Sequence, residues 1–220
     1  MPEELVSGCW WFDLGGVNAY MIEDGDDVVL VDAGMPWGVD DLRAEIRATG
    51  HDLDDITRVF VTHYDIDHVG GLAKLSLDVP IHIGAKDADF LLGRRGPPLS
   101  NRKGLLQRLT GWLLRAPEGV DPIADGDEVG SFTAYDTPGH TPGHVAFVSR
   151  ERGVAFLGDL VRESDGDLTP SPWALSYDMG DVRASIRYLL RDGPPFDVAC
   201  VGHGRPLVTG GHDALARSLE

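Results

Sequence analysis

Short apolar runs separated by polar turns recur along the whole chain. Runs rich in β-branched residues and bounded by Gly, Asp or Pro are typical of strands. They predict strands at Val17–Ile22, Val28–Val31, Arg58–Thr62, Ile81–Ile83, Phe132–Asp136, Val145–Val148, Val154–Leu157 and Val198–Val201. The turn-prone residues 24–27 separate the first two runs.

A second pattern, with apolar residues three or four positions apart, predicts helices between these runs. The helices are expected at Gly38–Ala48, Gly70–Leu75, Asp178–Arg191 and Asp213–Leu219. Asp178 is a candidate N-cap for the third helix, whose apolar face holds Ile186, Leu189 and Leu190. Strands followed by alternating strands and helices occur twice. We therefore expect an α/β sandwich of two mixed sheets with outer helices, in a single domain over residues 1–220.

Residues 91–117 differ from the rest because they contain six cationic residues and no acid. Leu105, Leu109, Trp112 and Leu113 recur at helical spacing, and Arg108 and Arg115 follow one flank. We expect an inserted basic helical segment at about residues 88–117. Three roles fit it: a surface helix paired with carboxylates, a cap over a site for an anionic substrate, or a dimer surface.

Composition narrows the classes of function. The chain has 19 Lys and Arg against 36 Asp and Glu, a formal charge of −17, and 42% hydrophobic residues. This charge disfavours nucleic acid and anionic membranes as default partners. No apolar stretch has membrane-spanning length and no signal peptide is visible, so we expect a cytoplasmic protein. Cys9 and Cys200 are expected to be buried and unpaired.

The acidic excess is rich in aspartate, and lysine occurs only at positions 74, 86 and 103. A high-GC genome explains the scarcity of lysine, whereas adaptation to a salt-rich cytoplasm explains the net charge as well. We adopt a halophilic origin as a hypothesis.

The chemistry concentrates in the stretch from Thr62 to Gly71, which follows a predicted strand and reads THYDIDHVGG. Side chains alternate on an extended loop, so His63, Asp65 and Asp67 are expected to converge, while His68 points to a second, adjacent place. Four metal-ligand side chains lie within this short stretch. A metal site explains the cluster better than a solvated polar loop does.

Three further ligand-type side chains follow predicted strands. His140 lies in the repeat TPGHTPGH, Asp159 follows Gly158, and His203 lies between Gly202 and Gly204. Sites in open α/β sheets form at such strand ends.

From about Asn18 to about Arg205 the chain resembles the metallo-β-lactamase superfamily, whose pattern is HxHxDH followed by His, Asp and His. The early VDAG turn is part of this resemblance, and the repeated TPGH resembles the glyoxalase II-like and lactonase-like branches. The resemblance implies a four-layer αββα sandwich with two mixed sheets and a binuclear metal site. It assigns one ion to His63, position 65 and His140, assigns the other to Asp67, His68 and His203, and makes Asp159 the bridge.

The chain departs from the family at Asp65, where the pattern has histidine. Aspartate is a credible ligand, but it makes the first site more anionic, and more tolerant of Mn or Fe. Two divalent ions are expected, with zinc as the first choice.

The resemblance also implies a mechanism, in which a metal-bound hydroxide attacks the substrate. Asp67 is the candidate for orienting that nucleophile and moving its proton. Asp32 and His144 are expected to support the ligands from behind. Candidates for lining the substrate pocket are Tyr64, Trp173, Arg108 and Arg115.

The function expected from these features is hydrolysis of a small ester-like bond, such as a thioester or lactone, in a small-molecule substrate. The alternative is an iron-dependent oxidoreductase of the same fold, persulfide dioxygenase-like or di-iron, because Asp65 supplies a carboxylate. A nuclease or phosphodiesterase is less favoured because of the charge. A metal-free binding protein is disfavoured because the remaining ligand positions are all present.

Overall fold

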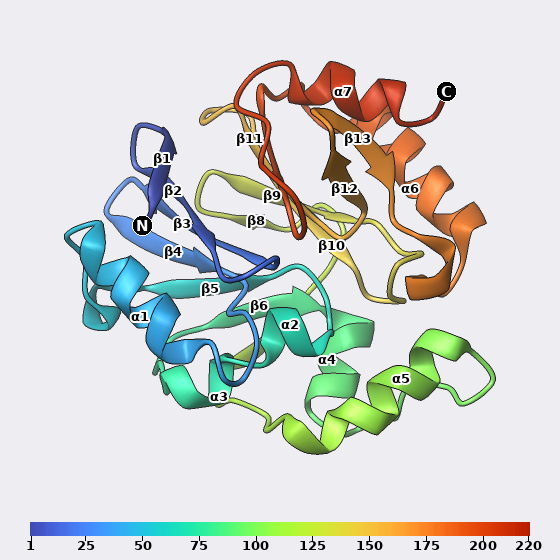
Figure 1. Ribbon diagram of the computed structural model, residues 1–220, viewed down its shortest axis with the longest axis horizontal. Helices are drawn as coiled ribbons and strands as arrows, with labels where there is room; N and C mark the ends of the chain where they lie inside the picture. Colours follow the sequence, from blue (N-terminus) through green and yellow to red (C-terminus); the bar gives the residue numbers. More distant parts are fainter.

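The computed structural model describes residues 1–220 and stacks two sheets between two layers of helices (Figure 1). The first sheet has seven strands in the order in which they occur along the chain. They are β1 (Glu3–Val6), β2 (Cys9–Asp13), β3 (Asn18–Asp24), β4 (Asp27–Val31), β5 (Arg58–Val61), β6 (Ile81–Gly84) and β7 (Val120–Ile123). The pairs from β1 to β4 are antiparallel and those from β4 to β7 are parallel, so the sheet is mixed.

The second sheet has five strands in the order β14-β11-β10-β9-β8. Their bounds are β8 (Glu128–Val129), β9 (Phe132–Asp136), β10 (Val145–Ser149), β11 (Val154–Gly158) and β14 (Val198–Val201). The β11–β14 pair is parallel and the others are antiparallel. A separate hairpin consists of β12 (Val161–Ser164) and β13 (Asp167–Pro170).

Helices cover the outer face of each sheet (Figure 1). The first sheet is covered by α1 (Val39–Ala48), α2 (Ile66–Val69), α3 (Leu72–Leu75) and α4 (Ala85–Leu91). The second sheet is covered by α6 (Met179–Asp192) and α7 (Gly211–Arg217). The remaining helix, α5 (Arg102–Thr110), lies at the edge of the molecule. No helix combines the length and the apolar character needed to cross a bilayer.

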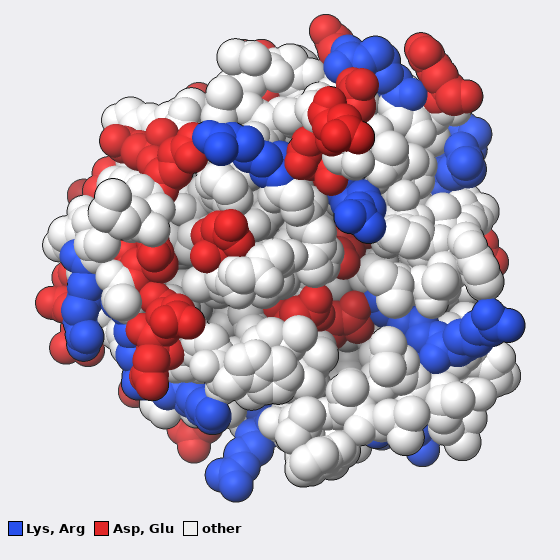
Figure 2. Space-filling model, viewed as in Figure 1, with Lys and Arg blue, Asp and Glu red and all other residues white.

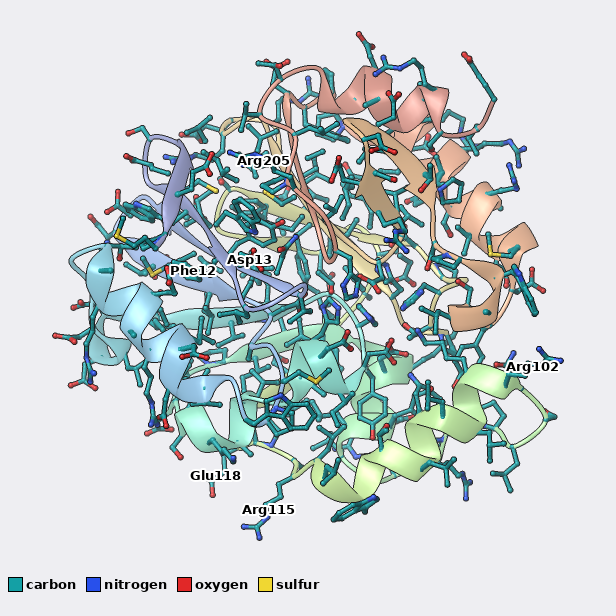
Figure 3. The ribbon with its side chains drawn as sticks, viewed as in Figure 1. Phe12, Asp13, Arg102, Arg115, Glu118 and Arg205 are labelled. Atoms are coloured by element: carbon teal, nitrogen blue, oxygen red, sulfur yellow. The ribbon has the colours of Figure 1, made fainter.

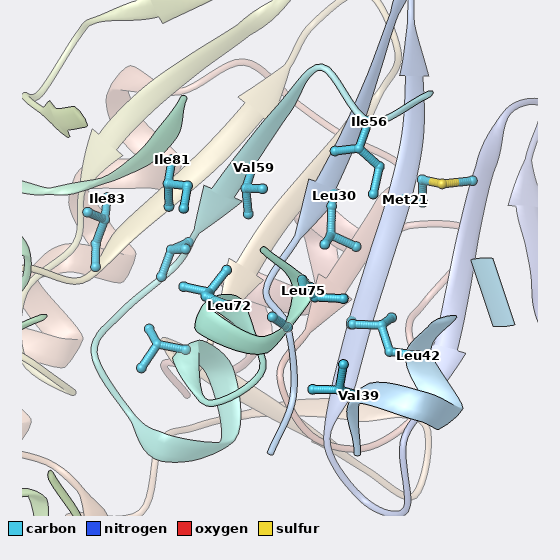
Figure 4. Close-up of a cluster of buried hydrophobic side chains, with 14 of the residues drawn as sticks. Met21, Leu30, Val39, Leu42, Ile56, Val59, Leu72, Leu75, Ile81 and Ile83 are labelled. Atoms are coloured by element: carbon cyan, nitrogen blue, oxygen red, sulfur yellow. The ribbon is translucent and has the colours of Figure 1, made fainter. Parts of the chain in front are cut away.

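Strand alternation explains the layering. In β4, Leu30 faces the helices of the first sheet, whereas Val29 and Val31 face the second sheet. Figure 4 shows the helix side of this arrangement, where Leu42 of α1 lies in the same buried cluster as Leu30. Aromatic rings fill the space between the sheets, and Phe60 stacks on Phe147 with ring centroids 4.3 Å apart. Two sheets, each apolar on both faces, therefore give the four-layer αββα sandwich expected from the sequence.

The eight predicted strands are all present, with their ends shifted by at most a few residues. Asp178 caps α6 as predicted, since its Oδ1 accepts hydrogen bonds from the backbone N–H groups of Gly180 and Asp181 at 2.7 and 3.1 Å. The predicted helix at Gly70–Leu75 is present as α3 but begins at Leu72, and α2, which was not predicted, precedes Gly70 and Gly71. A Cβ on Gly71 would lie 2.2 Å from the carbonyl oxygen of Ala33, so glycine permits this close approach.

The amphipathic interpretation of residues 91–117 has the correct helix but the wrong buried face. Leu109 is 63% exposed and Trp112 is 79% exposed. The buried residues of α5 are instead Lys103, Gly104 and Gln107. The reason is that α5 packs against polar groups of the ligand loops, which its polar side chains can satisfy and leucines cannot.

Candidate metal centre

The seven predicted ligands come from four loops at one edge of the sandwich. His63 follows β5, Asp65 precedes α2, and Asp67 and His68 lie within α2. The other three side chains are His140 in the loop after β9, Asp159 at the end of β11 and His203 at the end of β14. Strand ends thus place residues from distant parts of the chain beside one another.

The ligand atoms form three overlapping clusters in which all atoms lie within 4.8 Å of one another. The clusters are His63, Asp65 and His140; His63, His68 and Asp159; and Asp67, His68 and His203. Asp159 connects them, because its Oδ2 lies 3.3 Å from the Nε2 atoms of both His140 and His203. The first and third clusters match the two ligand sets that the family resemblance implies.

One part of the sequence prediction is wrong: the alternation of side chains does not continue past Asp65. The backbone becomes helical at Ile66, so Asp67 does not join His63 and Asp65. Asp67 and His68, as neighbours on the helical turn of α2, instead both reach the cluster of His203.

Each imidazole is held through its Nδ1 and directs its Nε2 toward the centre. His68 Nδ1 lies 2.7 Å from Asp32 Oδ2, and His203 Nδ1 lies 2.7 Å from the carbonyl oxygen of Gly16. Since carboxylates and carbonyls only accept, these Nδ1 atoms carry the proton, which leaves each Nε2 lone pair for a cation. Asp32 therefore has the supporting position expected for it.

The remaining two imidazoles are oriented by hydroxyl groups. His63 Nδ1 lies 3.0 Å from Thr62 Oγ1, and His140 Nδ1 lies 2.6 Å from Ser171 Oγ. Ser171 follows the β12–β13 hairpin, and nothing in the sequence pattern singled it out.

Two observations indicate that these clusters suit a divalent metal. The Nε2 atoms of His63 and His68 and the Oδ1 of Asp159 are buried and have no hydrogen-bond partner, which is costly unless a cation binds there. Burial alone would lower the pKa of His203, but Asp159 and Asp67 outweigh it and raise this pKa to about 10. Carboxylates that stabilise a protonated imidazole in this way would also stabilise a metal ion in place of the proton.

His144 lies behind the centre. It is buried, and its ring stacks on that of His63 with centroids 5.2 Å apart. Its Nδ1 lies 2.8 Å from Thr137 Oγ1, and it belongs to none of the three clusters. This position agrees with a supporting role.

A buried carboxylate that was not among the predicted site residues joins the two ligand loops. Asp87 of α4 accepts hydrogen bonds from Tyr64 N at 2.8 Å and from Gly143 N at 2.7 Å, and it also contacts the Thr141 hydroxyl. It thereby fixes the loop of His63 relative to the loop of His140. Because these contacts form only in the folded chain, no local pattern marks Asp87.

Two side chains of α5 enter the first cluster. Lys103 Nζ lies 2.6 Å from Asp65 Oδ2 and also contacts His140 Nε2. Gln107 Nε2 lies 2.8 Å from Asp65 Oδ1. Burial would raise the pKa of Asp65, but the charge of Lys103 outweighs this and holds the pKa well below its usual range. In the sequence, Lys103 is distinguished only as one of the six cationic residues of the segment 91–117.

The clusters open into a cavity of about 320 Å³. Its lining is Met35, Asp65, Ile66, Asp67, Lys103, Leu106, Gln107, Thr110, His140, Asp159, Leu175 and His203. None of the four residues proposed to line the substrate pocket is among them. Tyr64 is buried in the apolar core between the first sheet and its helices, and Trp173 is 65% exposed and stacks with Arg102.

The two arginines also point elsewhere. The guanidinium of Arg108 donates from Nε to the carbonyl oxygen of Pro97 at 2.7 Å, which ties it to the preceding loop. Arg115 is exposed at the outer end of the inserted segment (Figure 3). The expectation that these arginines receive an anionic substrate at the site is therefore not supported by their placement.

Comparisons with known proteins agree with this geometry. Residues 12–203 match the family model described as "Metallo-beta-lactamase superfamily". The probable metallo-hydrolase YybB of Bacillus subtilis is 30% identical over 87% of this chain and 82% of its own length. The thioesterase pkgB of Emericella nidulans is 26% identical over 87% of this chain and 46% of its own length.

Two further matches cover a short and a long part of the chain. A hydroxyacylglutathione hydrolase of Cereibacter sphaeroides is 35% identical over 47% of this chain and 33% of its own length. The crystal structure of a metallo-β-lactamase family protein from Thermus thermophilus superimposes with a TM-score of 0.73 and 22% identity, over 98% of this chain and 79% of that chain. The chain therefore belongs to the metallo-β-lactamase superfamily, and its His/Asp centre has the donor set of a metallohydrolase.

Proposed function

We propose that this protein is a metal-dependent hydrolase of thioesters, or of esters of similar reactivity, that carry an apolar acyl group. One observation carries the proposal: the metal-suited clusters form the floor of a cavity whose remaining wall is largely apolar. Met35, Ile66, Leu106 and Leu175 supply that wall. An acyl chain can contact these side chains while its carbonyl group lies over the carboxylates and imidazoles.

Hydrolysis adds water to the carbonyl carbon, breaks the bond from carbon to sulfur, and releases an acid and a thiol. A bound divalent metal would lower the pKa of water and stabilise the oxyanion. The protein contributes orientation and proton transfer. Asp67 lies at the cavity floor with its Oδ2 3.4 Å from His203 Nε2, so its carboxylate can accept the proton of the attacking water and pass it to the leaving sulfur.

The names of distant relatives support this substrate class, since they include a thioesterase and a hydroxyacylglutathione hydrolase. The oxidoreductase alternative was motivated by the carboxylate of Asp65. In the structure both oxygens of that carboxylate already accept hydrogen bonds, from Lys103 and Gln107. These contacts explain the aspartate at position 65 without redox iron.

The test is a hydrolysis panel of acyl thioesters, lactones, phosphodiesters and β-lactams with the metal-loaded protein. We expect thioesters with apolar acyl groups to have the highest kcat/KM. Asp67→Asn should lower it about 10²–10⁴-fold and also weaken metal binding. The matched control is Asp26→Asn, in the exposed turn between β3 and β4, which should retain wild-type turnover.

Two results would contradict the proposal. One is wild-type turnover by Asp67→Asn. The other is a protein that leaves every ester intact and consumes oxygen with glutathione persulfide when loaded with iron.

A further inference from the structure

The ammonium group of Lys103 occupies the first ligand cluster. Nζ lies 2.6 Å from Asp65 Oδ2 and contacts His140 Nε2, so two of the three ligand atoms of that cluster already face a cation. The side chain is 3% exposed and enters from α5, outside the ligand loops. A histidine Nε2 has one lone pair, so His140 can accept from Lys103 or bind a metal, but not both.

The surroundings of Lys103 hold the lysine in this position. Asn101 caps α5 by accepting from Lys103 N at 2.9 Å, and its Nδ2 donates to the carbonyl oxygen of Tyr177 at 3.0 Å. One turn further on, Gln107 accepts from the Tyr177 hydroxyl, which directs its amide group toward Asp65 Oδ1. A Cβ on Gly104 would lie 2.2 Å from Pro98 O, so the absence of a side chain there permits α5 to pack this closely.

The third cluster contrasts with the first. No lysine or arginine is in contact with the carboxylate of Asp67 or of Asp159, whose only ion-pair partners are histidines. His68 Nε2 and Asp159 Oδ1 have no hydrogen-bond partner, and neither has His63 Nε2, the one ligand atom of the first cluster that Lys103 does not contact. The first cluster therefore contains a cationic side chain of the protein itself, whereas the third cluster contains no lysine or arginine.

From this contrast we propose that the centre binds one divalent metal ion, at Asp67, His68, Asp159 and His203, and that the Lys103 ammonium replaces the second ion at His63, Asp65 and His140. The proposal explains the departure at position 65. A neutral histidine there would leave a buried ammonium unpaired, whereas Asp65 and Lys103 together are neutral and well hydrogen-bonded.

The inference deepens the proposed hydrolase function and rests on it for its chemical meaning. Lys103 lines the cavity, and its ammonium has three N–H groups, two of which face Asp65 and His140. The third is free to donate to the carbonyl oxygen of a bound ester as negative charge develops on that oxygen. Lys103 would thus supply the electrostatic stabilisation that a second metal ion gives in a binuclear site.

The experiment is a count of metal ions that does not depend on activity. Purified protein is loaded with excess Zn²⁺ or, separately, Mn²⁺, freed of unbound metal and measured by inductively coupled plasma mass spectrometry. We expect one ion per chain for the wild type and two for Lys103→Met, which vacates the first cluster but keeps an unbranched side chain. The matched control is Lys86→Met, which removes an exposed lysine and should leave the count at one.

A second measurement does not need a folded variant. Titration of the wild-type apoprotein with Co²⁺, followed by its visible absorbance, should saturate at one equivalent. Two ions in the wild type, none in the wild type, or one ion in a folded Lys103→Met protein would each overturn the inference.

These outcomes are separable from those of the proposed function. An esterase with two ions in the wild type would retain the function and refute the role of Lys103. If the wild type binds one ion, Lys103→Met binds two and no ester is hydrolysed, the role of Lys103 is supported and the proposed hydrolase function is refuted.

Discussion

Asp32 shows how a single side chain can set the geometry of a ligand. Its Oδ2 accepts from His68 Nδ1 at 2.7 Å and from the Thr62 hydroxyl at 2.8 Å, while its Oδ1 accepts from Thr62 N at 2.9 Å. The carboxylate therefore orients His68 and also fixes the start of the loop that carries His63. Asp32 has a φ of +58°, a left-handed conformation that asparagine also tolerates.

Asp32→Asn should consequently fold but bind metal more weakly. The amide keeps the size of the side chain, yet it is a poorer partner for His68 and places an NH₂ group where a donor already points. We expect the dissociation constant for Zn²⁺ to rise about 10–100-fold in a competition assay with a chromophoric chelator. Asp41→Asn, on the exposed side of α1, is the control, and equal affinities for the two variants would contradict the role of Asp32.

The candidate ligands are readable from the sequence because they lie in short segments that follow predicted strands. His63 and His203 each lie two positions after the last residue of an apolar run. Lys103 and Asp87 could not be found in that way. Lys103 contacts Asp65, which is 38 residues away in the sequence, and Asp87 contacts Tyr64, which is 23 residues away. Such contacts exist only once the helices are packed.

At the level of elements, α5 is unusual because its polar side packs inward. Gln107 is buried and donates to the carbonyl oxygen of Tyr64 at 2.5 Å and to Asp65 at 2.8 Å. Leu109, two residues later, is 63% exposed. The helical periodicity was therefore sufficient to predict the helix, but not which face is buried, because that depends on the polarity of the surface beneath it.

A pair of substitutions on α5 tests this orientation. Gln107→Leu removes a hydrogen-bond partner from Tyr64 O, Asp65 Oδ1 and the Tyr177 hydroxyl, and should lower the free energy of unfolding by about 1–3 kcal/mol. Leu109→Gln should change it by less than about 0.5 kcal/mol, since the side chain is already in water. Urea denaturation measures both changes in the free energy of unfolding. A larger loss for Leu109→Gln than for Gln107→Leu would show that the apolar face is the buried one.

The apolar face of α5 also bears on assembly. Leu105 and Leu109 of α5 and Trp112 just beyond its end are exposed, and Leu106 of α5 lines the cavity. The dimer surface suggested by the sequence remains a prediction for this face.

The whole molecule carries far more negative than positive charge. On the visible face, acidic side chains gather on the left, at the top and in the central hollow, whereas the lower right, where α5 lies, is mostly uncharged or basic (Figure 2). The charge of −17 is the sum of 36 acidic and 19 basic side chains, and only three of the acids are candidate metal ligands. Metal binding can therefore neutralise a small part of the charge, and the rest produces repulsion across the surface.

The effect of salt on stability depends on which of two opposing contributions is larger. Salt weakens exposed ion pairs such as Arg205–Glu3 and Arg47–Asp52, which lowers the stability of the folded state. Such exposed pairs contribute little to that stability. Salt also screens the repulsion among the unpaired carboxylates, which stabilises the folded state, and these carboxylates are far more numerous. The second contribution should therefore dominate.

We expect the folded state to gain about 1 kcal/mol or more between 0.1 and 2 M KCl, a rise in Tm of about 2–4 °C for a domain of this size. Differential scanning calorimetry of the metal-free protein measures the rise without interference from metal binding. Sucrose at equal osmolality is the control, since it lacks ions and separates screening from general exclusion of solutes. A Tm that is unchanged or lower in KCl would contradict salt adaptation and leave the aspartate excess without a role in stability.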